Sequence, residues 1–314
     1  MPKGSPIAPP IEFATLEEYL EAVGTHYSAC MDHVEHDLVI DDVEATLRFH
    51  HLKFDGNGEP KFNALAQTLV DHIIYFCIAS RQRQGTLKAH EYSRLFRQAR
   101  DLFRKEDKTG EPGEILLYFL LETVLKAPQV VCKMSLKTNR REEVKGSDGI
   151  HVAYDEDKDC IVLYLGEAKL YQGYGEALAD AFDSIATLHS QKRADYEIEL
   201  VTSHFKHVNV EVQEKISEYL DSSNPTGECR ICHACLIGYD WTKFGELTTP
   251  KRKQFVKNFK TEYLKHCKRL ATKTSKLFEG YACKHLSFEF FFVPFQSVGD
   301  FRAAFKRALL AGEE

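Results

Sequence analysis

Asp148, Glu167 and Lys169 have the side-chain types that metal-assisted hydrolysis uses. The carboxylates of Asp and Glu are hard oxygen ligands for a divalent cation. The ammonium group of a lysine can contact the attacking water or a scissile phosphate. These residues can act together only if the chain between them folds back on itself.

The segment from Gly146 to Tyr171 predicts a β-hairpin that brings these side chains together. Its turn is the acidic, polar run 155–159. Residues that face each other across an antiparallel hairpin have a constant sum of residue numbers, which is about 314 for this turn. We therefore expect Asp148 beside Gly166 and Glu167.

Side chains on the second strand of this hairpin alternate between the two faces of the sheet. One face carries Ile161, Leu163, Leu165, Glu167 and Lys169, and the other carries Val162, Tyr164 and Ala168. Two apolar faces indicate a central strand covered on both sides, where an unpaired charge is costly. A Glu–Lys ion pair at a hairpin end is one explanation of the charges. We favour the other, a divalent metal held by Asp148 and Glu167.

A third candidate acid, Glu114, lies at the start of a predicted helix. Pro112 suits the first turn of this helix, and its apolar stripe is Leu117, Leu121, Val124 and Leu125. Glu114 precedes Leu117 by one helical turn, so it should point at whatever the helix packs against. The alternative is an acid that interacts only with the helix dipole.

The order of predicted elements indicates an α/β fold. From residue 109 the order is helix, strand, strand, strand, helix, with later strands at 236–241 and 285–295. Residues 1–108 predict a mainly helical region, with a strand within 37–54. We therefore divide the chain into an accessory region, 1–108, and a domain that carries the candidate site, 109–314.

The composition indicates a protein with a full hydrophobic core. The chain has 314 residues, 43% of them hydrophobic, and a formal net charge of -6. No apolar run approaches the roughly 18 residues of a membrane span, and the first ten residues lack the core of a signal peptide. The nine cysteines are scattered and odd in number, which favours reduced thiols. We expect a cytoplasmic protein without membrane association.

Nucleic-acid binding would have to come from local basic segments, because the net charge is negative. Residues 250–276 predict a helix with ten Lys or Arg and a single acid, Glu262. Phe255, Phe259 and Tyr263, at spacing four, would dock this helix with its cations outwards. A second set of cations is Arg81, Arg83, Arg94, Arg97, Arg100 and Arg104. Each set is interpreted either as a surface for a nucleic-acid backbone or as a solvated helix surface.

The segment 229–235 invites comparison with a zinc site. It contains Cys229, Cys232, His233 and Cys235, with a single C-x-x-C pair. A closed structural site usually takes its second pair of ligands from farther along the chain. Such a pair would have to come from Cys267 and Cys283, so we do not expect zinc here. The glycine-containing runs GSDG and QGYG also lack the pattern of a P-loop or dinucleotide motif.

Taken together, these residues resemble the PD-(D/E)xK nuclease superfamily. The resemblance consists of Glu114 at the head of an amphipathic helix, then Asp148, then the run 167–169 followed by another helix. More narrowly, GEILLYFLLE, GSDGIH and LGEAKLY resemble the HamA family of effectors in the Hachiman anti-phage defence system, from about residue 85 to the C-terminus. Ser147 stands where the superfamily name has proline, which weakens the motif match and leaves the ligands untouched.

The resemblance implies a restriction-endonuclease-like core, in which helices flank a mixed central sheet. It implies a DNA nuclease that depends on Mg²⁺ or Mn²⁺ and works with a helicase partner, HamB. Asp148 and Glu167 would be metal ligands and Lys169 would contact water and phosphate. Glu114 would be the helical acid near the metal, and the carbonyl of Ala168 is a further candidate ligand. A non-catalytic DNA-binding or adaptor protein on the same fold is the alternative.

Overall fold

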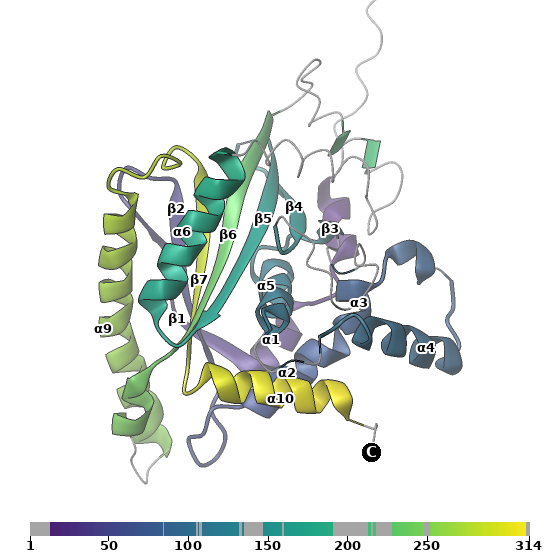
Figure 1. The fold of residues 1–314 in the computed structure, drawn as a ribbon, viewed down its shortest axis with the longest axis horizontal. Coiled ribbons are helices and arrows are strands. Elements are labelled where there is room, and N and C mark those ends of the chain that lie inside the picture. Colours follow the sequence, from purple (N-terminus) through teal and green to yellow (C-terminus); the bar gives the residue numbers. More distant parts are fainter. Residues whose placement is uncertain are drawn as a thin grey trace, which may run out of the picture.

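The strands of the computed structural model form one twisted, mixed sheet (Figure 1). The structure describes residues 13–83, 85–104, 106, 109–131, 134, 147–158, 160–190, 213–214, 216–217, 228–247 and 252–311. Gly146, where the predicted hairpin begins, and the side chain of Arg81 lie outside this part of the chain.

Seven strands of the described chain form the sheet, in the spatial order β1-β2-β7-β6-β5-β4-β3. Their bounds are β1 Met31–Val39, β2 Ala45–Leu52, β3 Gln129–Val131, β4 Ile150–Asp155, β5 Cys160–Tyr171, β6 Glu228–Asp240 and β7 Ser287–Phe295. The four central strands, β2, β7, β6 and β5, run parallel to one another. The outer strands pair antiparallel, β1 with β2 at one end and β4 with β5 and β3 at the other.

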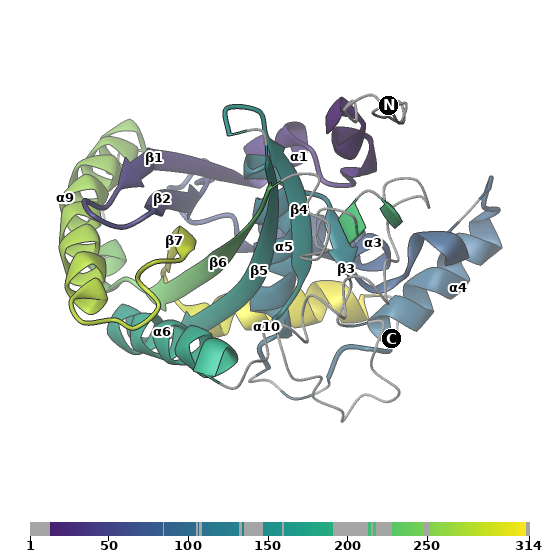
Figure 2. The same ribbon diagram turned by 90° about the horizontal axis from the view of Figure 1, so that it is seen from above.

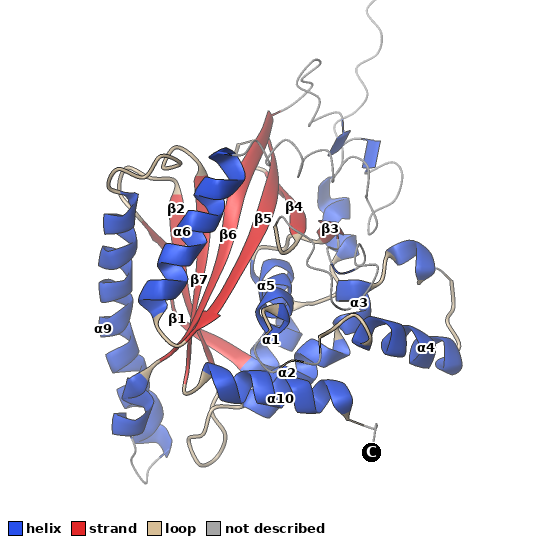
Figure 3. Ribbon diagram, in the orientation of Figure 1, coloured by secondary structure: helices blue, strands red, loops and turns tan. Residues whose placement is uncertain are grey.

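Helices cover both faces of the sheet, as Figure 3 shows in blue against the red strands. One face is covered by α6 (Tyr174–Ser190) and α9 (Arg252–Phe278). The other is covered by α5 (Glu111–Val124), α2 (Phe62–Asp71) and α10 (Val298–Leu310). The view from above separates these two helical layers (Figure 2). The predicted fold class, a mixed central sheet flanked by helices, is confirmed.

All but one of the remaining helices in the described chain lie in its N-terminal part. They are α1 (Gly24–Cys30), α3 (Ile73–Cys77) and α4 (Ala89–Arg100), together with the 3-10 helices η1 (Phe13–Tyr19), η2 (Ser80–Gln82) and η4 (Thr242–Leu247), the last of which precedes α9. None of the helices that the structure describes has the length and apolar character needed to cross a membrane.

Alternation along the strands explains why both faces are buried. In β7, Phe288, Phe290 and Phe292 pack towards α6 and α9, whereas Phe291 and Val293 pack towards the opposite layer. This is the pattern of a strand buried on both sides. It places the candidate residues of β5 in a sheet with little freedom to shift.

The N-terminal part of the chain contributes strands as well as helices. β2 pairs parallel to β7, with Ala45 opposite Phe288, and α2 packs against α10. The predicted division between residues 108 and 109 therefore separates segments that share one sheet. Because the pairing of β2 joins residues more than 200 positions apart, local sequence patterns do not reveal it.

Candidate functional site

The hairpin of β4 and β5 forms with nearly the predicted register. Ile150 pairs with Leu165, and Asp155 pairs with Cys160. The residue numbers of each pair add up to one more than the predicted sum of about 314. Beyond the paired strands, the backbone N–H of Asp148 donates to the carbonyl of Gly166 at 2.8 Å. Asp148 thus lies beside Gly166 and Glu167, as the hairpin spacing predicts.

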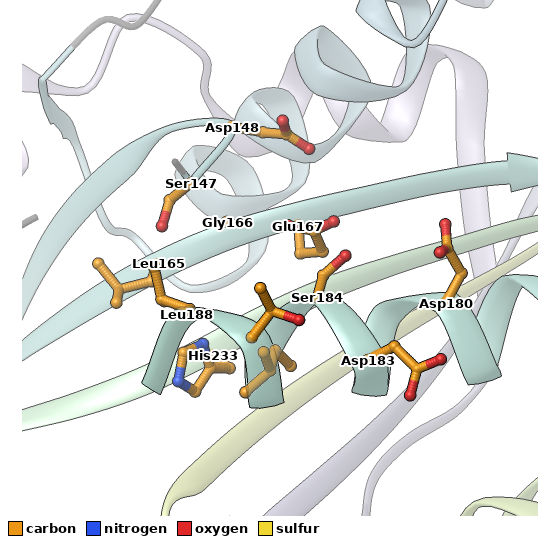
Figure 4. A pocket seen from close by; sticks show the side chains of 12 residues that line it. Ser147, Asp148, Leu165, Gly166, Glu167, Asp180, Asp183, Ser184, Leu188 and His233 are labelled. Carbon is orange, nitrogen blue, oxygen red and sulfur yellow. The ribbon is translucent and has the colours of Figure 1, made fainter. Parts of the chain in front are cut away.

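Asp148 and Glu167 line one cavity of about 330 Å³ between the hairpin and α6 (Figure 4). Asp180, Asp183 and Ser184 of α6 line the same cavity, and Figure 4 shows Ser184 and Asp180 pointing towards the strand that carries Glu167. The backbone N–H of Ala168 donates a hydrogen bond of 2.8 Å to Oδ2 of Asp148. This bond ties the first acid to the strand that carries the second.

Burial and the neighbouring charge of Asp148 raise the pKa of Glu167. Two close carboxylates repel each other, and low exposure removes the water that would screen them. The side chain of Glu167 is 19% exposed. A divalent cation would relieve this repulsion, so the donor set fits a hard metal ion such as Mg²⁺.

The set of protein ligands is nonetheless small. Among the residues that the structure describes, no three Asp, Glu, His or Cys side chains are grouped closely enough to hold a metal ion. Mg²⁺ commonly binds through one or two carboxylates and completes its shell with waters and substrate phosphates. Two carboxylates in an open cavity therefore match its usual requirements.

Lys169 joins two carboxylates beside the cavity. Its Nζ atom lies 2.8 Å from Oε1 of Glu167 and 2.8 Å from Oδ2 of Asp180. Burial opposes the charge of Lys169, but these two acids outweigh burial and raise its pKa. Lys169 is therefore protonated at neutral pH and acts as a fixed positive charge.

Asp180 and its partner Tyr171 are site residues that the sequence pattern missed. The Tyr171 hydroxyl donates to Oδ2 of Asp180 at 2.7 Å. Burial would raise the pKa of Asp180, but the hydrogen bonds from Lys169 and Tyr171 lower it. Tyr171 follows Lys169 by two residues on the same strand face, and this spacing is a signal that sequence analysis could have used.

Glu114 does not line this cavity. Its helix α5 packs on the opposite face of β5, where a Cβ atom added to Gly113 would lie 3.0 Å from Leu170 and 3.4 Å from Ala168. Its Oε1 atom lies near Gly110, at the N-terminus of the helix. The structure thus brings Asp148, Glu167 and Lys169 together but separates Glu114 from their cavity, and its role as helical acid stays a prediction.

Cys229, Cys232, His233 and Cys235 all lie on the long strand β6. Because side chains alternate along a strand, Cys232 packs towards α5, whereas Cys235 packs towards α6. His233 shares a hydrogen bond of 2.8 Å between its Nε2 atom and that of His189. Side chains that point to opposite faces do not suit a single tetrahedral ion.

Comparison with known proteins identifies the family of the chain. A search of curated proteins gave no significant match. The family model for HamA matches residues 26–309, which is nearly the whole chain. The matched range includes the sheet and the candidate site. The chain therefore belongs to the HamA family and is, by that membership, a component of the Hachiman anti-phage defence system.

Proposed function

We propose that this chain is a metal-dependent DNA nuclease, the effector of its defence system, and that it works with a helicase partner. One observation carries the proposal: Asp148 and Glu167 share a cavity, and Lys169 is ion-paired to Glu167 at its edge. An acid, a second acid and a lysine in this order along a hairpin also resemble the PD-(D/E)xK nucleases. Membership of the HamA family agrees with an effector role.

In this proposal Asp148 and Glu167 hold Mg²⁺ or Mn²⁺. A metal bound there would supply positive charge to the scissile phosphate and would make a water molecule more acidic. The N–H of Ala168 fixes the carboxylate of Asp148, which limits the reorganisation needed when substrate binds. The carbonyl of Ala168 and the carboxylate of Glu114 are further candidate contributors.

Lys169 orients water or stabilises charge on the phosphate and does not remove a proton. Its raised pKa favours the charged ammonium group at physiological pH. The contact with Asp180 holds its ammonium group when Glu167 binds the metal. Lys169 would therefore keep Asp180 as a partner if Glu167 turned to a metal ion.

The experiment compares cleavage of labelled duplex DNA by the wild type, Lys169→Met and Glu167→Gln. We expect wild-type cleavage with Mg²⁺ or Mn²⁺ and none with EDTA. Each variant should lose about 100- to 1000-fold, the usual effect of removing one charge-stabilising group. Lys88→Gln, which removes an exposed lysine just before α4, is the matched control for loss of a single positive charge.

Each reaction is run with the isolated protein and with the helicase of the same defence system, because the family resemblance implies restraint by a partner. Equal degradation by the wild type and Lys169→Met would refute the proposed role of this site. Absence of cleavage by the wild type under both conditions would refute the nuclease assignment.

The alternative is a DNA-binding or adaptor protein that does not cleave. The basic helix α9, with nine Lys and Arg and one acid, is the observation that favours it. In that case DNA binding survives Glu167→Gln, weakens steeply with salt and is never followed by cleavage with any divalent metal. Metal-dependent cleavage that requires Glu167 would exclude this alternative.

A further inference from the structure

One buried face attaches the helix α9 to the rest of the protein. Phe255, Phe259, Tyr263, Leu270 and Phe278 are at most 7% exposed. The Tyr263 hydroxyl donates to the carbonyls of His50 and Phe292, at 3.0 and 3.3 Å. The opposite face of α9 is consequently presented to solvent along the whole helix.

That outward face is strongly cationic. By sequence, the nine Lys and Arg residues and the single Glu give the helix α9 a net charge of +8. The whole chain carries -6, so the remainder is acidic and the positive charge is concentrated in one element. Lysines crowded on one helix repel each other, so their own helix gains no stability from them.

Few of these cations are neutralised within the protein. In the described residues, Lys260 pairs with Asp32 at 3.0 Å and Lys265 pairs with Glu262 at 2.5 Å. Three exposed lysines have no acid within ion-pair distance among the described residues: Lys257, Lys268 and Lys276. These charges are available to an external anion.

The cations follow two lines along the helix. Five of them share one line of i, i+4 positions, with Thr261 as the uncharged member of the series: Lys253, Lys257, Lys265, Arg269 and Lys273. A second line runs beside the first and has a cation at every eighth residue: Lys260, Lys268 and Lys276. A helix of 27 residues is about 40 Å long, which corresponds to about 12 base pairs of duplex DNA.

The composition of this face favours a nucleic-acid backbone over a protein partner. Protein interfaces are enriched in aromatic residues and depleted of lysine at their centres. The aromatic residues of α9 are instead buried against the sheet, and Leu264 is the large apolar residue exposed on the helix, at 39%. A regular row of lysines suits repeated phosphates, which give affinity without sequence selectivity.

The cationic face also adjoins the helix that lines the candidate site. Lys273 Nζ lies 4.9 Å from the ring centre of Tyr174, the first residue of α6. Figures 1 and 2 both show α6 and α9 side by side on one face of the sheet. Asp180, Asp183 and Ser184 of α6 line the cavity, so DNA held on α9 lies next to the helix that contacts Lys169.

We propose that the cationic face of α9 binds the phosphodiester backbone of DNA without sequence selectivity. The proposal rests on the nuclease function for its choice of DNA as the polyanion. Binding itself requires neither the metal nor cleavage, so the two proposals can fail separately.

The test measures binding of a fluorescently labelled DNA duplex of random sequence to the whole protein in EDTA. Fluorescence anisotropy reports binding, and the measurement is repeated over a range of salt concentrations. The variant combines Lys257→Gln, Lys268→Gln and Lys276→Gln, because glutamine has a helix propensity close to that of lysine. A control triple removes the same number of exposed charges away from α9: Lys88→Gln, Lys126→Gln and Arg307→Gln.

We expect the α9 triple to weaken binding by at least about 10-fold and to reduce the slope of log K against log salt by about three. The control triple should leave both quantities unchanged. Equal effects of the two triples would refute the proposal, since binding would then follow total charge. Unchanged DNA binding by the α9 triple would also refute it. Loss of helicase association by that triple, with DNA binding intact, would assign the surface to an acidic protein.

Glu167→Gln separates this proposal from the catalytic one. Cleavage that depends on Glu167, together with unchanged binding by the α9 triple, would refute the α9 surface alone.

Discussion

Glu122 of α5 gives the sharpest prediction about stability. Its side chain is almost fully buried, with 1% exposed. Oε2 accepts hydrogen bonds from the backbone N–H groups of Glu21 and Ala22, at 2.9 and 2.7 Å, and Oε1 accepts one from Gln129 at 3.4 Å. A single carboxyl group thus joins the segment before α1 to α5 and β3.

Burial raises the pKa of Glu122 from 4.5 to about 7, even though three N–H groups favour the charged form. Between pH 4.5 and 7 the unfolded protein loses this proton while the folded protein keeps it, so stability falls as the pH rises. Above pH 7 the carboxyl is ionised in both states and the loss is complete. It amounts to about 3 kcal/mol at 1.36 kcal/mol for each pH unit between the two pKa values.

The perturbation is Glu122→Gln, which keeps the shape of the side chain and one acceptor oxygen but cannot ionise. The free energy of unfolding of the variant minus that of the wild type should be about 3 kcal/mol larger at pH 8 than at pH 4.5, because only the wild type loses stability over this range. For a chain of this length that is about 5 °C in melting temperature. Chemical unfolding at several pH values measures the difference.

Glu122→Ala is the matched control, because it removes the acceptors as well as the charge. It leaves buried N–H groups without partners and should destabilise the protein at every pH, by roughly 1 to 3 kcal/mol. A constant difference between the wild type and Glu122→Gln from pH 4.5 to 8 would refute the reasoning, since Glu122 would then ionise alike in both states.

Two further predictions concern the candidate site. Asp180→Asn should lower the pKa of Lys169 and reduce cleavage by up to about 100-fold. As the pH is raised, the variant should begin to lose activity at a lower pH than the wild type does. Asp183→Asn, which lines the same cavity without an ion pair to Lys169 among the described residues, is its control, and identical pH profiles for the two variants would contradict the role of Asp180. Gly166→Ala would place a Cβ atom 3.2 Å from the carbonyl oxygen of Gly149 and 3.1 Å from Leu117. We expect the free energy of unfolding to fall by about 1 to 3 kcal/mol. Cleavage should also weaken, because Gly149 is next to Asp148 in the chain. A variant as stable and as active as the wild type would contradict this prediction.

Sequence alone determined the features that depend on short stretches of chain. The turn at 155–159 and the alternation of β5 place Asp148 beside Glu167, because a hairpin pairs residues that are close in sequence. Helical spacing of Phe255, Phe259 and Tyr263 likewise predicts which side of α9 is buried. The fold class follows from the order of such elements.

Tertiary structure alone decided the features that join distant parts of the chain. Parallel pairing of β2 with β7 places the N-terminal strands in the same sheet as the candidate site. α5 packs on the face of β5 that carries Gly166 and Leu170, away from Glu167, so Glu114 does not reach the cavity. α6 crosses the other face and brings Asp180 to Lys169. Helix periodicity shows that a helix has an inner side, but only packing in three dimensions selects the sheet face on which it lies.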